Sequence, residues 1–224
     1  MDKSLGFMID ALPALLSGAW ITLQLTAIAT VLGLIGGIVL GVARLSKVKL
    51  ISLLARVYID FFRGTPLLVQ LYIIYFGIPV LLDSLSIGFR FNQWGAAILG
   101  LSLNSAAYLA EIVRAGIQSI ELGQREAAES LGLGPTHTMQ YVVFPQAIRR
   151  MIPPLGNEFI TLLKDTSLVA VIGYQELFRQ GQLIVAKNFR SFEIYAAVAL
   201  IYLVLTVLSS QVFSLLERKM DPKQ

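Results

Sequence analysis

Residues 19–43 form an unbroken run without a single charged side chain. An α-helix needs about 20 apolar residues to cross the hydrocarbon core of a bilayer, so this run is long enough to span one. The whole chain has the same character, because 56% of its 224 residues are hydrophobic and 14% are charged, whereas about 25% are charged in soluble domains. We therefore predict an all-α, polytopic membrane protein with a single transmembrane domain over residues 1–224.

Five spans are predicted, and the fourth differs from the others in polarity. The predicted spans cover about residues 19–43, 58–82, 91–117, 151–174 and 192–216. The first carries Gly33, Gly36, Gly37 and Gly41 on one side, which favours close packing on a neighbouring helix. The fourth contains several charged and amide side chains, so it must face protein or water rather than acyl chains. Residues 1–17 are weakly amphipathic, and we expect them to be retained and to lie at the membrane surface.

The distribution of Lys and Arg predicts the orientation. Five spans place the two termini on opposite sides of the membrane, and cytoplasmic segments carry the excess of positive charge. With the N-terminus outside, the inner segments hold ten basic residues and the outer segments hold five, Lys3, Arg90, Arg179, Lys187 and Arg190. We therefore expect the C-terminus and the segment 120–150 to be cytoplasmic.

The longest polar insertion, Gly123–Pro145, separates the third and fourth predicted spans. Residues 124–131 are good helix formers, and Gly132 with Gly134-Pro135 ends that helix. We predict a second short helix, stopped or kinked at Pro145. A helix, a tight bend and a helix outside the bilayer are suited to fit a groove on a partner. A solvated helix pair without a partner is the alternative.

The same segment resembles the EAA loop of the permeases of ABC importers. Val142 and Phe144 stand where the family pattern has Ile and Leu, and the matching residues are Glu126, Ala127, Ala128, Gly132 and Pro145. Three further stretches resemble the polar amino-acid branch of that family: residues 63–70 (RGTPLLVQ), 104–111 (NSAAYLAE) and 155–159 (LGNEF). Together the four stretches follow the family order from about Leu12 almost to the C-terminus.

This resemblance implies a fold and a set of partners. The fold would be the five-helix, MetI-like arrangement of type I ABC importers, in the cytoplasmic membrane of a bacterium. Two ATP-binding subunits would dock on the loop 120–150, through Arg125, Glu126, Ala127, Ala128, Gly132 and Pro145. A second permease subunit, identical or similar, and an extracytoplasmic substrate-binding protein would complete the importer.

No cofactor is expected on this chain, and it is not expected to be an enzyme. It lacks the GxxxxGK phosphate loop followed by Ser or Thr, so ATP and magnesium are assigned to the partner ATPase. Cysteine is absent and His137 is the sole histidine, which argues against a metal site. No basic run is long enough to suggest nucleic-acid binding.

Substrate is expected where polar side chains are buried within the spans. An amino acid presents an ammonium group and a carboxylate, which need an acceptor and a donor held close together. Our first candidates are Asn104, Glu158, Lys164 and Asp165, followed by Tyr108 and Thr65. Glu158 and Asp165 favour a cationic amino acid, although Lys164 weakens that preference. A structural Glu158–Lys164 pair, or Lys164 and Asp165 extending to the outer interface, is the alternative.

Other charged pairs are expected to hold helices together. Glu111 and Arg114 lie three residues apart, as do Asp60 and Arg63.

Two other classes of membrane protein predict different patterns. A secondary transporter or channel without an ATPase would have an internal repeat, and a membrane-embedded enzyme would have a nucleophile–base pair or a metal cluster. Neither pattern is visible in the sequence.

Overall fold

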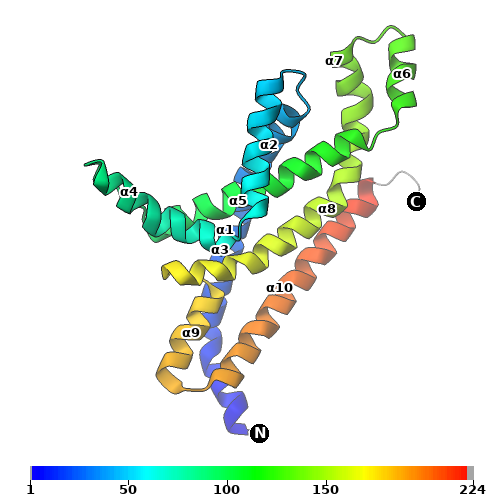
Figure 1. Ribbon diagram of the computed structural model, residues 1–224. Helices are drawn as coiled ribbons and strands as arrows, with labels where there is room; N and C mark the ends of the chain where they lie inside the picture. The colour runs from blue at the N-terminus through cyan, green and yellow to red at the C-terminus, as the bar shows by residue number, and fades with distance from the viewer. Residues whose placement is uncertain (1, 221–224) are drawn as a thin grey trace.

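The computed structural model describes residues 2–220, with side chains described from residue 6, and this part of the chain contains helices and no strands (Figure 1). The all-α prediction is confirmed. In chain order the elements are α1 (Asp2–Arg44), α2 (Lys49–Gly64), α3 (Leu67–Tyr72), the π-helical η1 (Ile73–Gly77), α4 (Ile78–Ser84), α5 (Gln93–Gln118), α6 (Leu122–Ser130), α7 (Pro135–His137), the π-helical η2 (Thr138–Val143), α8 (Phe144–Asp165), the 3-10 helix η3 (Thr166–Ile172), α9 (Leu177–Asn188) and α10 (Ser191–Met220).

Four helical runs within residues 2–220 are long and apolar enough to cross a membrane: Gly6–Arg44, Leu67–Ser84, Gln93–Gln118 and Ser191–Met220. The chain is therefore polytopic, as predicted. The helix α8, which covers most of the predicted fourth span, is not among these runs because of its polar side chains. The total of five spans remains a prediction.

The first helix extends further toward the N-terminus than the sequence suggested. Residues 2–17, which we expected as a separate surface segment, form the start of α1 and run without a break into the first span. Leu15 is fully buried in an apolar cluster with Leu177 of α9 and Ile194 of α10. Helices far along the chain thus provide the partner that makes these residues part of the bundle; Met1 lies outside the described residues.

The glycine face of α1 packs on α5. A Cβ atom at Gly37 would lie 2.6 Å from Cβ of Leu109, and one at Gly41 would lie 2.7 Å from the carbonyl oxygen of Ala110. Real Cβ atoms do not approach this closely, so only glycine allows the two backbones to meet here. The predicted packing face is confirmed, and α5 is the buried centre of the bundle.

The predicted second span is divided into two helices. Thr65 between α2 and α3 is extended, with φ −120° and ψ 144°, because the residue before a proline is driven out of the helical region. The helix is therefore broken at Gly64–Pro66, and the chain then runs in a different direction (Figure 1). The apolar helical run in this part of the chain that is long enough to cross a membrane begins at Leu67.

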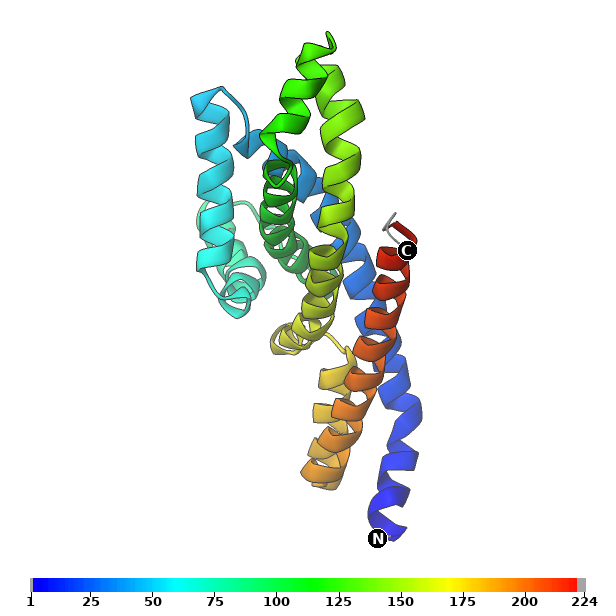
Figure 2. The same ribbon diagram turned by 90° about the vertical axis from the view of Figure 1, so that its right-hand side faces the viewer.

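The polar insertion forms a helix, a bend and a second helix, at the opposite end of the molecule from the N-terminus (Figures 1 and 2). Gly132 takes the left-handed conformation, φ 82°, that ends α6. The second helix is not short, however. Pro145 lies at the start of α8 and does not stop it, because the π-helical turns of η2 precede the proline and the helix continues from Pro135 to Asp165.

Candidate functional site

A polar cavity of about 480 Å³ opens where the break between α2 and α3 faces α5 and α8. This volume is within the range of small-molecule sites. The break contributes backbone and a hydroxyl group, α5 contributes an amide and a phenol, and α8 contributes two carboxyl groups. The lining residues are Arg63, Gly64, Thr65, Pro66, Leu67, Asn104, Tyr108, Glu158, Thr161, Asp165 and Leu168.

The broken backbone is held open by a buried amide. Gln70, which is 3% exposed, donates from Nε2 to the carbonyl oxygen of Phe62 at 2.9 Å and to the carbonyl and hydroxyl oxygens of Thr65 at 3.0 and 2.9 Å. Its Oε1 accepts a hydrogen bond of 3.0 Å from Nδ2 of Asn104. The proline break frees helix carbonyls, and this latch between the two stretches 63–70 and 104–111 satisfies them.

The acidic side of the cavity is one face of α8. Glu158, Thr161 and Asp165 follow helical steps of three and four residues, so they lie above one another. Lys164 lies elsewhere, because residues adjacent in a helix point in different directions. It lines a separate hollow with Phe178, Tyr195 and Tyr202, among others, beside α9 and α10. The structure thus brings five of the six predicted substrate residues together and separates Lys164 from them.

Arg63 is a cavity residue that the sequence analysis missed. We expected it to pair with Asp60, but it forms an ion pair with Glu111 of α5, Nη1 to Oε2, at 3.9 Å. Its guanidinium group lies over the ring of Tyr108, 5.4 Å from the centroid. Arg63 begins the stretch 63–70, while Tyr108 and Glu111 belong to the stretch 104–111. The sequence signal that could have identified Arg63 is its membership of one family-like stretch whose partner residues lie in the other.

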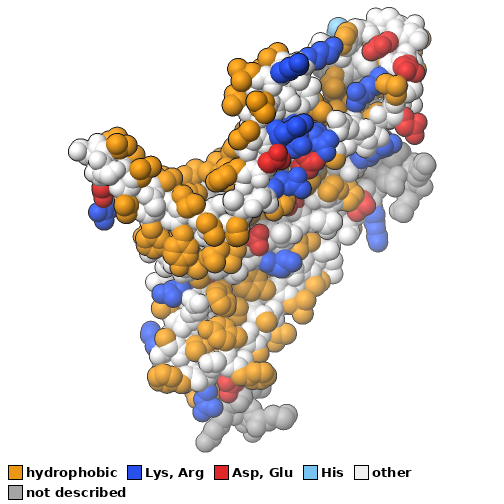
Figure 3. Space-filling model, viewed as in Figure 1, with side chains coloured by type: hydrophobic (Ala, Val, Ile, Leu, Met, Phe, Trp, Pro, Cys, Tyr) orange, Lys and Arg blue, Asp and Glu red, His pale blue; other side chains and the backbone are white. Residues whose placement is uncertain are grey.

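Glu111 is the centre of a larger charge cluster. It pairs with Arg114, as predicted, and also with Arg44 at the end of α1, at 2.9 Å. Figure 3 shows basic and acidic side chains side by side where α2 meets α5. The ends of α1, α2 and α5 are thereby joined through one carboxylate.

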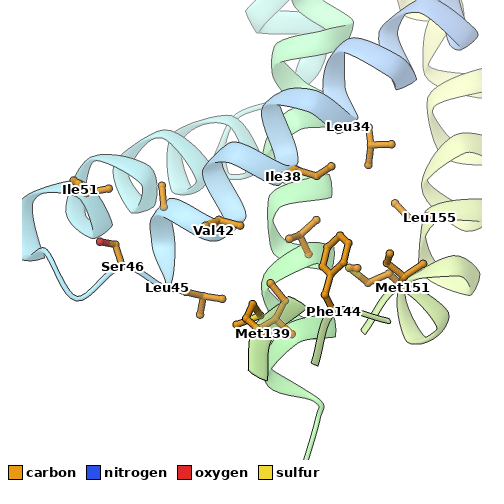
Figure 4. Close-up of a pocket in the computed structure, with 14 residues that line it drawn as sticks. Leu34, Ile38, Val42, Leu45, Ser46, Ile51, Met139, Phe144, Met151 and Leu155 are labelled. Atoms are coloured by element: carbon orange, nitrogen blue, oxygen red, sulfur yellow. The ribbon is translucent and has the colours of Figure 1, made fainter. Parts of the chain in front are cut away.

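A second, larger hollow of about 680 Å³ is apolar (Figure 4). It lies between α1, α5, η2 and α8 and is lined by Ile38, Val42, Phe144, Met151 and Leu155, among others. On α5 it contacts Val113, nine residues after Asn104, which is about two and a half helical turns and hence the opposite face. Charged groups of a zwitterion would find no partner there, so the polar cavity is the candidate substrate site.

The α6–α7 bend presents both exposed and internally bonded residues. Arg125 donates from Nη2 to the carbonyl oxygen of Ile117 at 2.8 Å, which ties α6 to the end of α5. Ala128 is buried, whereas Glu126 and Ala127 are exposed. Leu131 is 84% exposed at the tip. Of the predicted coupling residues, Glu126 and Ala127 therefore offer contact surface, while Arg125 and Ala128 shape it.

Comparisons with known proteins agree on one family. The model for "binding-protein-dependent transport system inner membrane component" matches residues 29–222. The chain is 44% identical to the glutamine transport system permease protein GlnP of Escherichia coli (strain K12), over 94% of each chain. It is 39% identical to the arginine transport system permease protein ArtQ of Bacillus subtilis (strain 168), over 98% of each.

Solved structures show the same fold. A crystal structure of an amino acid ABC transporter with histidines contains a chain that is 43% identical, with a TM-score of 0.88 over 95% of this chain and 96% of that one. An inward-facing methionine transporter, MetNI, matches at 20% identity with a TM-score of 0.76, over 93% of this chain and 96% of that one. The MetI-like fold implied by the sequence is thereby confirmed.

Proposed function

Since the chain belongs to the family of binding-protein-dependent transport system inner membrane components, we propose that it is the membrane permease subunit of an ATP-driven importer of polar amino acids. The relatives named for glutamine and arginine transport support the substrate class. The observation that carries the proposal is the polar cavity, which gathers Asn104, Glu158 and Asp165 at the break of a membrane helix. Buried polar groups in a membrane protein mark substrate pathways.

The cavity has groups for each part of an amino acid. Glu158 and Asp165 can accept hydrogen bonds from an ammonium group or a cationic side chain, and Thr65 and Asn104 add neutral polar contacts. With Lys164 outside the cavity, the preference for a basic amino acid is stronger than the sequence alone indicated. A glutamine side chain would use the same acceptors through its amide.

The α6–α7 bend is proposed as the site where two ATP-binding subunits dock. ATP and magnesium would bind those subunits and not this chain. Because the helix that leaves the bend continues through η2 and α8 to Asp165, a displacement of the bend is transmitted to Glu158 and Asp165. Closure of the ATPases would thus change access to the cavity, the usual alternating-access mechanism.

The remaining parts of the assembly are proposed from charge and geometry. With α8 counted as the fourth of five spans, the N-terminus lies outside and the C-terminus in the cytoplasm, as the Lys and Arg distribution favours. A second permease subunit would complete the pathway, and a substrate-binding protein would deliver the amino acid from outside.

The test is to purify this subunit with the ATPase encoded beside it and to reconstitute the complex in liposomes with its binding protein. We expect one or a few of the twenty amino acids to stimulate ATP hydrolysis and to accumulate inside. Uptake driven by an ion gradient without the ATPase would contradict the proposal and favour a secondary transporter.

A further inference from the structure

Three arginines surround the single carboxylate of Glu111, and they do not share it equally. Arg114 donates from Nε to both carboxylate oxygens at 3.1 Å, and Arg44 donates from Nη1 at 2.9 Å. Arg63 reaches only to 3.9 Å, beyond hydrogen-bond distance. The cluster therefore holds three positive charges and one negative charge, and Arg63 is the arginine that contacts the carboxylate most weakly.

Arg63 also differs from the other two in where it lies. Its side chain is 40% exposed, against 19% for Arg44 and 25% for Arg114. It is the member of the cluster that lines the polar cavity. The ring of Tyr108 lies beneath its guanidinium group and forms a cation–π contact with it.

The cavity thus has a positive group from α2 and two acidic groups from α8. A zwitterionic amino acid carries the complementary pair of charges. An arginine side chain recognises a carboxylate through two parallel, charge-assisted hydrogen bonds, which give both strength and a defined orientation.

On the basis of the proposed function, we propose that Arg63 binds the carboxylate of the amino acid, exchanging its long contact with Glu111 for a two-pronged contact with substrate, while Glu158 and Asp165 take the positive end. Glu111 keeps Arg44 and Arg114 and is not left unpaired by this exchange. The α-carboxylate, common to all amino acids, would then set the class of substrate, and the acids of α8 would select within it.

The experiment is equilibrium binding to the purified permease–ATPase complex without its binding protein, so that the permease cavity alone determines affinity. The probes are L-arginine and L-glutamine, each compared with its methyl ester, which lacks the carboxylate charge. We expect wild type to prefer the free amino acid to the ester. Arg63→Gln should weaken binding of the amino acid by about ten- to a hundredfold and leave the ester unchanged, so that the preference disappears.

Arg44→Gln is the matched control, because it removes another partner of Glu111 that does not line the cavity; the preference for the free amino acid should persist. Arg63→Lys keeps the positive charge but cannot form the two parallel hydrogen bonds of a guanidinium group, so we expect a loss of affinity between those of wild type and Arg63→Gln. It also serves if Arg63→Gln fails to assemble, as judged by gel filtration.

Two results would overturn the inference in distinguishable ways. If Arg63→Gln and Arg63→Lys keep the wild-type preference while Asp165→Asn abolishes binding, the cavity is the substrate site but Arg63 is not the carboxylate ligand. If wild type binds neither probe nor any other of the twenty amino acids, the proposed function fails and the inference fails with it.

Discussion

Single residues in the cavity have separable roles, and Asp165 offers the clearest case. It lines the cavity, whereas its neighbour Lys164 lines a different hollow. We predict that Asp165→Asn lowers the affinity for the transported amino acid about tenfold or more, because a charge-assisted contact becomes a neutral one. Binding to the purified complex measures this. Lys164→Gln is the matched control and should leave affinity unchanged; equal losses in both variants would contradict the assignment.

Asn104 has a structural duty as well as a place in the cavity. Its amide donates to Gln70, which in turn holds the broken backbone at Thr65. Asn104→Ala leaves the buried Oε1 of Gln70 without this donor, at a cost of about 1–3 kcal/mol. We therefore predict a lower melting temperature, measured on the detergent-solubilised complex. We also predict weaker uptake, measured in liposomes. The double variant Asn104→Ala/Gln70→Ala should recover no uptake; a melting temperature equal to wild type in the single variant would show that the latch is dispensable.

At the scale of the elements, the close contact between α1 and α5 can be tested by enlarging a glycine at the interface. We predict that Gly37→Ala destabilises the complex by about 1–3 kcal/mol, because the new methyl group would lie 2.6 Å from Cβ of Leu109. The melting temperature reports the change. Gly6→Ala, also in α1, meets no atom within 4 Å and should be neutral. A neutral Gly37→Ala would mean that the two helices separate easily.

The α6–α7 bend is predicted to act through its exposed surface. Glu126→Lys reverses a charge on that surface without removing a packed side chain, so the subunit should insert and assemble normally. We expect it to lose most substrate-stimulated ATP hydrolysis. Glu121→Lys makes the same reversal at an exposed position before α6 and is the control. Normal stimulation in Glu126→Lys would remove this residue from the docking surface.

For the whole molecule, the predicted orientation can be tested by chemistry, since the chain contains no cysteine. A Cβ atom added at Gly88 or at Gly134 would meet no other atom within 4 Å, so both positions have room for a cysteine. We expect a membrane-impermeant maleimide to label Gly88→Cys in intact cells and Gly134→Cys only after permeabilisation. The reverse pattern would place the α6–α7 bend outside and exclude an ATPase there.

Local chemistry predicted much of this fold because it acts over a few residues. The uncharged run 19–43 and the end of the α6 helix at Gly132 could both be read from residue types. What escaped prediction depended on distant partners. The part of α1 around Leu15 joins the bundle because α9 and α10 cover that residue, and Arg63 turns to Glu111 because α5 passes beside it. The grouping of Lys164 with Asp165 relied on sequence adjacency, where helical direction was decisive.

The helix that runs from Pro135 to Asp165 packs tightly against α5 near its middle, where a Cβ atom at Gly116 would overlap the side chain of Met151. We expect this contact to act as the pivot when the helix moves. The part of the helix that carries Glu158 and Asp165 then moves in the direction opposite to that of the α6–α7 bend. The same movement would therefore increase the distance between these two acids and Arg63, and so lower the affinity for the bound amino acid as the cavity opens.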